Sequence, residues 1–121
     1  MTILSAQQIH ELLGNISTAC IEIQQALNMH LEATSSSQYK IDIEKDMVTL
    51  ENLKLIIVAV KEDIESEKVG ASTELLLRIA ANDFKNKVAR IPEKKALRED
   101  VAKTLKEVHH HILRMQIKEG Q

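Results

Sequence analysis

Apolar residues recur at alternating intervals of four and three positions through almost the whole chain. The first series lies near the N-terminus and consists of Ile9, Leu13, Ile16, Cys20, Ile23 and Leu27. The same spacing returns in three later series, which run from Ile43 to Ile64, from Leu77 to Ile91 and from Val101 to Met115. Such heptad spacing places one narrow apolar stripe along a helix, and another helix must cover that stripe. The chain is therefore predicted to be all-α.

Four helices are predicted within a single domain that spans residues 1–121, at approximately 6–33, 38–68, 73–90 and 93–118. Ser5 followed by Gln8 fits a capping box at the start of the first helix, and Ser72 or Thr73 is the expected cap of the third. Pro92 is expected to break the helical run after the third helix. These signals predict an antiparallel bundle of three to four long helices with coiled-coil-like packing. They leave open whether the third and fourth helices fold back or form one kinked rod.

The composition limits the functions that fit this fold. The chain has 121 residues, a formal net charge of −2 and only two aromatic residues of the Phe, Trp and Tyr types, Tyr39 and Phe84. Few aromatic side chains and a weakly acidic charge do not favour nucleic-acid binding. The longest apolar run, from Leu55 to Val60, is too short to cross a membrane. We therefore expect no membrane-spanning segment.

The second predicted helix carries apolar residues outside its main stripe. Leu55, Ile56 and Val58 lie off the heptad series, so the middle of this helix is apolar on nearly all sides. A β-strand would also suit this segment, but the heptad phase continues through it and favours the helix. One antiparallel neighbour cannot cover both faces. We predict that Leu55, Ile56 and Val58 mediate self-association, which gives a homodimer or larger homo-oligomer.

A basic segment surrounds Pro92. Its six cationic residues are Lys85, Lys87, Arg90, Lys94, Lys95 and Arg98. This segment is predicted to bind an acidic surface of a protein partner, or to pair with the acidic second helix within the fold or across a dimer. A nucleic-acid-associated protein that uses the basic bend at 85–98 is an alternative interpretation.

Neither of the two polar clusters in the chain predicts a metal centre. Glu107 and His110 have the Glu-x-x-His spacing of helical di-metal proteins, but no second pair exists and both residues are predicted to point away from the apolar stripe. His109 is likewise predicted to point outward, and His111 to lie at the flank of the stripe. A surface metal site built from His111 and Glu107 is the alternative to polar residues without a metal role.

The second cluster is the group of carboxylates on the second helix. All-helical nucleotide pyrophosphatases hold magnesium with carboxylates of this kind, but their Glu-Glu-x-x-Glu and Glu-x-x-Asp motifs are absent here. A metal-dependent enzyme of that type stays an alternative that rests on composition alone. We therefore predict no catalytic residue, no metal site and no cofactor.

The single cysteine, Cys20, lies on the first apolar stripe, where a buried thiol is expected. A lone thiol fits a reducing compartment, and no secretory signal is visible at the N-terminus, so the protein is predicted to be cytoplasmic. Taken with the strong helix-packing pattern, these features predict a non-enzymatic helical protein-protein interaction module of the adaptor, chaperone or inhibitor type.

Overall fold

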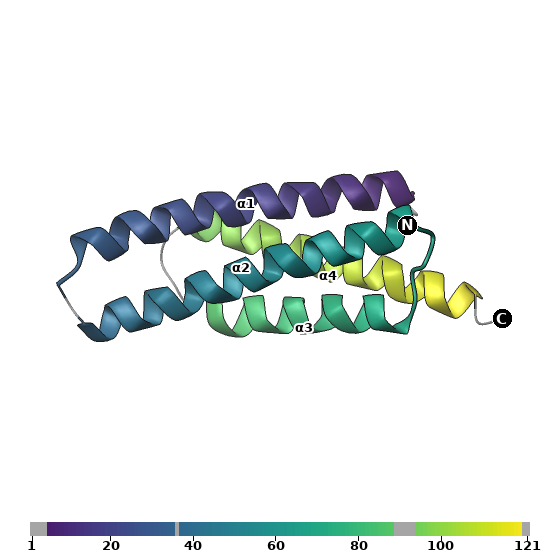
Figure 1. Ribbon diagram of the computed structural model, residues 1–121. Helices are drawn as coiled ribbons and strands as arrows, with labels where there is room; N and C mark the ends of the chain where they lie inside the picture. Colours follow the sequence, from purple (N-terminus) through teal and green to yellow (C-terminus); the bar gives the residue numbers. More distant parts are fainter. Residues whose placement is uncertain (1–4, 36, 89–93, 120–121) are drawn as a thin grey trace.

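The computed structural model is a bundle of four helices that lie side by side along one axis (Figure 1). The helices are α1 (Ala6–Ala33), α2 (Ser37–Glu65), α3 (Ala71–Lys87) and α4 (Lys95–Glu119). The structure describes residues 5–35, 37–88 and 94–119, with the backbone alone for 115–119. No strand occurs in these ranges. The predicted all-α bundle is confirmed, whereas the coiled-coil detail of its packing stays a prediction.

The chain runs up and down through the bundle, so each helix is antiparallel to the next (Figure 1). Contacts join α1 with α2, α2 with α3, α3 with α4, and α4 with α1, while the described residues of diagonally opposite helices do not meet. The third and fourth helices therefore fold back on each other and do not form one rod. Pro92, the predicted point of the break, lies outside the described residues.

The predicted stripes form the core. All six residues of the first series are buried. The other helices contribute the buried residues Ile43, Leu50, Leu53, Ile57, Val60, Leu77, Ala80, Phe84, Val88, Val101, Leu105, Val108 and Ile112. Met47, Ile64 and Ala81, which were assigned to the stripes, are only partly buried and pack against the edge of this core. Burial of apolar side chains along all four helices is what holds the bundle together.

The start of α1 has the predicted capping box. The amide of Gln8 donates to the Ser5 hydroxyl oxygen at 3.1 Å, and the amide of Ser5 donates to Oε1 of Gln8 at 2.8 Å. Two amides that have no partner within the helix are thereby satisfied. The prediction of this N-terminus from Ser5 and Gln8 is confirmed.

The end of α2 falls at Glu65, three residues before the predicted end at 68. The amide of Lys68 donates to the Asp63 carbonyl at 2.8 Å, and the amide of Glu67 donates to the Ile64 carbonyl at 3.2 Å. Glu67 has a φ of 56°, in the left-handed region. This pattern is a Schellman motif with a glutamate in the position that glycine usually occupies.

The connection from α2 to α3 is fixed by Thr73, which is fully buried. Its hydroxyl donates to Oδ2 of Asp63 at 2.7 Å and accepts from the amide of Gly70 at 3.2 Å. Gly70 is the N-cap of α3, so the expectation of a cap at Ser72 or Thr73 is wrong. Thr73 instead lies in the first turn and ties α3 to the end of α2.

None of the described helices is both long and apolar enough to cross a membrane.

Candidate protein-binding surface

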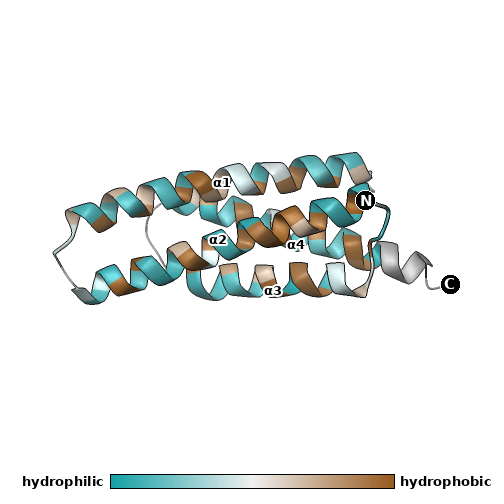
Figure 2. Cartoon of the chain, in the orientation of Figure 1, coloured by the Kyte–Doolittle hydropathy of each residue, from teal (hydrophilic) through white to brown (hydrophobic). Residues whose placement is uncertain are grey.

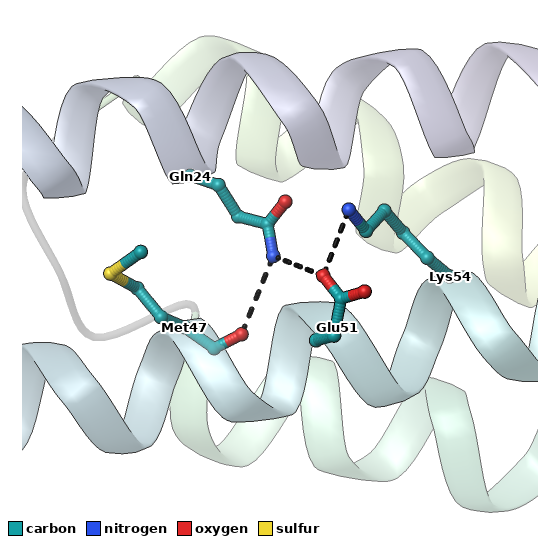
Figure 3. A network of polar contacts seen from close by, with 4 residues as sticks. All are labelled: Gln24, Met47, Glu51 and Lys54. Carbon is teal, nitrogen blue, oxygen red and sulfur yellow. Dashed lines mark hydrogen bonds and ion pairs between the residues drawn. The ribbon is translucent and has the colours of Figure 1, made fainter.

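Polar side chains bridge α1 and α2 at the middle of their contact (Figure 3). The amide nitrogen of Gln24 donates to Oε2 of Glu51 at 3.1 Å and to the Met47 carbonyl at 3.4 Å. The Lys54 ammonium lies 2.9 Å from the same carboxylate oxygen. Hydrogen bonds from Lys54, the larger effect, and from Gln24 lower the pKa of the Glu51 carboxyl. The carboxylate already has protein partners, so this network positions two helices against each other.

The register of α1 against α2 follows from three contacts. These contacts join His10 with Glu65, Gly14 with Lys61 and Gln24 with Glu51. From one pair to the next, the residue number on α1 rises by as much as the number on α2 falls, as expected for two antiparallel helices in constant register. The same register places Ser17 opposite Val58 and Ile21 opposite Lys54. Val58 therefore lies along the outer edge of the α1–α2 contact, beside the exposed side chain of Ile21.

The outer face of α2 carries a second heptad series, which we call the outer stripe. It consists of Ile41, Lys45, Val48, Asn52, Leu55, Ala59 and Glu62. All of these residues are exposed except Ala59, which is half-buried. Val48 is 59% and Leu55 is 62% exposed, although both are large apolar residues. Figure 2 shows hydrophobic residues through the middle of α2, and no other helix covers this face.

Of the three residues that we predicted to mediate self-association, two lie at this surface. Leu55 belongs to the outer stripe, and Val58, at 51% exposed, lies at its edge toward α1. Ile56 is half-buried and packs against the core on the α3 side. The four helices of one chain therefore bury Ile56 but leave Leu55 and Val58 without a covering helix.

A groove of about 850 Å³ borders the first half of the outer stripe, where α2 passes the end of α3. From the stripe it is lined by Ile41, Lys45, Val48 and Asn52, and from α3 by Asn86 and Lys87. Carboxylates of α2 complete its wall: Asp42, Glu44 and Asp46. The lining thus combines apolar side chains with charges of both signs, a mixture also found in protein–protein interfaces.

The residues of the basic segment do not form one continuous surface. Lys85, Lys94 and Lys95 are exposed at the end of the bundle where α3 finishes and α4 begins. Lys87 lines the groove and lies 3.8 Å from Asp83. Arg98 is only 4% exposed, so it does not belong to the surface to which we assigned it. Arg90 lies outside the described residues.

The histidine cluster lies differently from the prediction. Only His110 is exposed. Nε2 of His109 lies 2.8 Å from Oε1 of Glu74, which joins α4 to the first turn of α3. His111 is buried, with 8% of its surface exposed. The prediction that His109 points outward is therefore wrong, because this side chain lies in the contact between two helices.

In the described part of the chain, carboxylates and histidines meet in pairs but do not gather into larger groups. This part holds no group of three or more His, Cys, Asp or Glu side chains that could bind a metal ion. Several acidic residues of α2 instead contact neighbouring helices, as Asp63 does with Thr73 and Glu65 does with His10.

The Cys20 thiol is fully buried, as predicted from its place on the apolar stripe. Burial raises its pKa to about 12, since the apolar surroundings disfavour the thiolate. Nearby Lys54 opposes this effect and Glu51 adds to it, both more weakly than burial. A thiol of this kind is a core residue and not a reactive nucleophile.

Comparisons with protein-family models, with curated protein sequences and with solved structures found no match to this chain. The fold and the surface therefore define only a class, which is an up-and-down four-helix bundle with an uncovered apolar face on α2.

Part of this surface was not predicted from the sequence. The exposed residues Ile41 and Val48 were missed, although they precede Leu55 by two heptads and one heptad. A search for a second heptad series on the same helix would have found them. Arg98 likewise precedes Val101 by three positions, which continues the core spacing and signals its burial.

Proposed function

We propose that the protein is a non-enzymatic interaction module that binds other protein chains through the outer face of α2 and associates with itself through Leu55 and Val58. The observation that carries this proposal is the exposure of Val48, Leu55 and Val58 on one face of a bundle whose core is otherwise filled. Soluble monomers rarely expose apolar patches that have no partner. An amphipathic helix that presents apolar residues at heptad spacing suits a helical binding partner.

The basic end of the bundle is a second contact surface in this proposal. Lys85 near the end of α3, Lys94 just before α4 and Lys95 at the start of α4 are all exposed, and these two helices are neighbours (Figure 1). Exposed positive charges attract an acidic partner during its approach and mainly raise the association rate. This surface would serve an adaptor, a chaperone or an inhibitor equally well. The lone buried thiol of Cys20 supports a reducing compartment such as the cytoplasm.

Comparative affinity capture tests the proposal. The changes Leu55→Glu and Val58→Glu together place two charges on the outer face, and both side chains are exposed enough for the bundle to stay folded. We expect proteins captured by the unmodified chain to be lost from this variant. A matched control carries Met29→Glu and Leu75→Glu, which are also exposed apolar positions but lie on α1 and α3. Circular dichroism checks the helix content of both variants.

The two outcomes have clear meanings. Loss of captured proteins from the α2 variant but not from the control supports the outer face as the binding surface. An unchanged set of captured proteins would contradict it. In the same assay, reversal of Lys85, Lys94 and Lys95 to Glu measures the contribution of the basic end.

Two other functions are tested separately. A metal-dependent helical enzyme predicts a stoichiometric metal in the purified untagged protein. A nucleic-acid-associated protein predicts a gel shift that weakens steeply with salt. Among the described residues, no assembled site favours either of these functions over protein binding.

A further inference from the structure

The charges of the outer stripe are arranged symmetrically about its apolar centre. Lys45 lies toward one end and Glu62 toward the other, with Val48, Asn52, Leu55 and Ala59 between them. Both charged residues are exposed, and neither forms an ion pair with another described residue. A helix face with opposite charges at its two ends is complementary to an antiparallel copy of itself.

We propose that the outer stripe of α2 binds the same stripe of a second copy, antiparallel, about a two-fold axis at the level of Leu53 and Lys54. This inference rests on the proposed self-association and specifies its geometry. The register pairs Lys45 with the partner's Glu62, Val48 with the partner's Ala59, and Asn52 with the partner's Leu55. Because the axis is two-fold, each pair occurs twice, and the contact closes on itself as a dimer.

Charge complementarity selects this register over its neighbours. A shift by one heptad in one direction sets Lys45 against the partner's Leu55 and Val48 against the partner's Asn52. A shift in the other direction sets Glu62 against the partner's Asn52. Neither shifted register brings Lys45 and Glu62 together. A polar residue such as Asn52 within an apolar stripe also restricts the register of paired helices.

The groove beside α2 gives the partner helix room. Its walls include Ile41, Lys45, Val48 and Asn52, which form the first half of the stripe. In the proposed register, the second half of the partner's α2 lies over this half, so the partner's Leu55 and the partner's Ala59 approach the groove. In the same register, Val58 at the edge of the stripe lies near Glu51 of the partner subunit.

The size of the contact predicts a weak dimer. One helix packed on one helix is at or below the lower end of specific interfaces, which bury about 1,200 Å² or more in total. We therefore expect a dissociation constant in the micromolar range, which sedimentation equilibrium measures directly.

Charge exchange tests the register. Lys45→Glu alone sets two glutamates against each other at both ends of the dimer, and Glu62→Lys alone sets two lysines there. Each single variant is expected to raise the dissociation constant about tenfold, the effect of about 1.4 kcal/mol. The doubly exchanged variant restores both ion pairs and is expected to dimerise like the unmodified chain.

A mixture of the two single variants gives the sharpest result. A chain with Lys45→Glu and a chain with Glu62→Lys are complementary at both ends, so the mixture is expected to form a heterodimer as tight as the unmodified dimer. Glu22→Lys and Lys103→Glu are matched controls, since they make the same charge changes at exposed positions on α1 and α4. They are expected to leave the dissociation constant unchanged.

A monomeric mass for the unmodified chain up to about 200 µM, far above a micromolar dissociation constant, would overturn the proposal. So would a mixture of the two single variants whose dissociation constant is no lower than that of either variant alone. An equal increase of the dissociation constant by the control changes would also overturn it. A monomeric chain that still loses captured proteins through Leu55→Glu and Val58→Glu would overturn this dimer and the proposed self-association, while the proposed binding of other proteins stands. The two proposals therefore fail separately.

Discussion

At the scale of single residues, the central part of the bundle uses polar groups to set helix positions and apolar groups to fill volume. Cys20 illustrates the second role, since its thiol is completely buried and behaves as a small apolar side chain. Glu51 illustrates the first, since Gln24 and Lys54 hold its carboxylate at the surface between α1 and α2. The two residues lie near each other, yet burial raises the pKa of the Cys20 thiol, whereas hydrogen bonds lower the pKa of the Glu51 carboxyl.

The Cys20 thiol should be protected from labelling in the folded protein. Its pKa is raised to about 12, so it stays protonated at pH 8 to about 9, where a free thiol begins to ionise. We expect a maleimide or iodoacetamide to react far more slowly with the native chain than with the chain unfolded in guanidinium. Mass spectrometry measures the labelled fraction over time. Rapid labelling of the native chain would show that α1 is not packed as described.

The same shift predicts an alkaline loss of stability. Below pH 9.0, the ordinary pKa of the group, the thiol is protonated in both the folded and unfolded states and contributes no pH dependence. Above it, the unfolded thiol ionises while the folded one does not. Stability should therefore fall as the pH rises toward 12. Cys20→Ala removes this contribution, so its free energy of unfolding should decline less steeply with pH than that of the unmodified chain.

At the scale of helices and their connections, much of the architecture follows directly from the sequence. The heptad series predicted the core faces because a helix with one apolar stripe removes that stripe from water by packing it against other helices. The capping box at Ser5 was recognisable because both of its hydrogen bonds are local. The packing of α3 against α4 was not predictable, since it depends on contacts between helices and not on either helix alone.

The surface was predictable only in part, for a related reason. Leu55 and Val58 stood out as apolar residues off the main stripe, and the structure leaves them exposed. Arg98 was assigned to the surface as part of the basic segment, although it continues the core spacing of α4 and is buried. A long polar side chain at the edge of a stripe is buried when the neighbouring helix covers it.

The end of α2 offers a test of this local geometry. Glu67 adopts a φ of 56°, which costs a residue with a Cβ atom about 1 kcal/mol or more. Glu67→Gly should therefore raise the free energy of unfolding by about 1 kcal/mol and the Tm by a few degrees. Glu67→Ala removes the same carboxylate but keeps the Cβ atom, so it should not stabilise the protein. Equal stabilisation by both changes in a thermal melt would assign the gain to charge and not to backbone strain.

At the scale of the whole molecule, one closed bundle presents two different surfaces. The outer stripe of α2 carries exposed apolar residues between Lys45 and Glu62, whereas Lys85, Lys94 and Lys95 are exposed where α3 ends and α4 begins. The outer stripe runs along α2, which spans the length of the bundle, whereas the three lysines lie near the end of α3 and the start of α4 (Figure 1). A dimer formed through α2 would leave the lysines of both copies exposed, so the protein could bind an acidic partner as a pair.

Dimerisation through α2 should also make the thermal stability depend on protein concentration. A second copy that binds only the folded chain stabilises it by mass action, by about 2.7 kcal/mol when its free concentration is 100 times the dissociation constant. For a bundle of 121 residues this amounts to several degrees in Tm. We expect the Tm of the unmodified chain to rise between about 1 and 200 µM, a range that spans a micromolar dissociation constant. The Tm of the Lys45→Glu chain alone should rise less over this range, because its dissociation constant is about tenfold higher. An equal mixture with the Glu62→Lys chain should regain the full dependence. A Tm that is independent of concentration for the unmodified chain would contradict the proposed dimer, because no second copy would be stabilising the folded state.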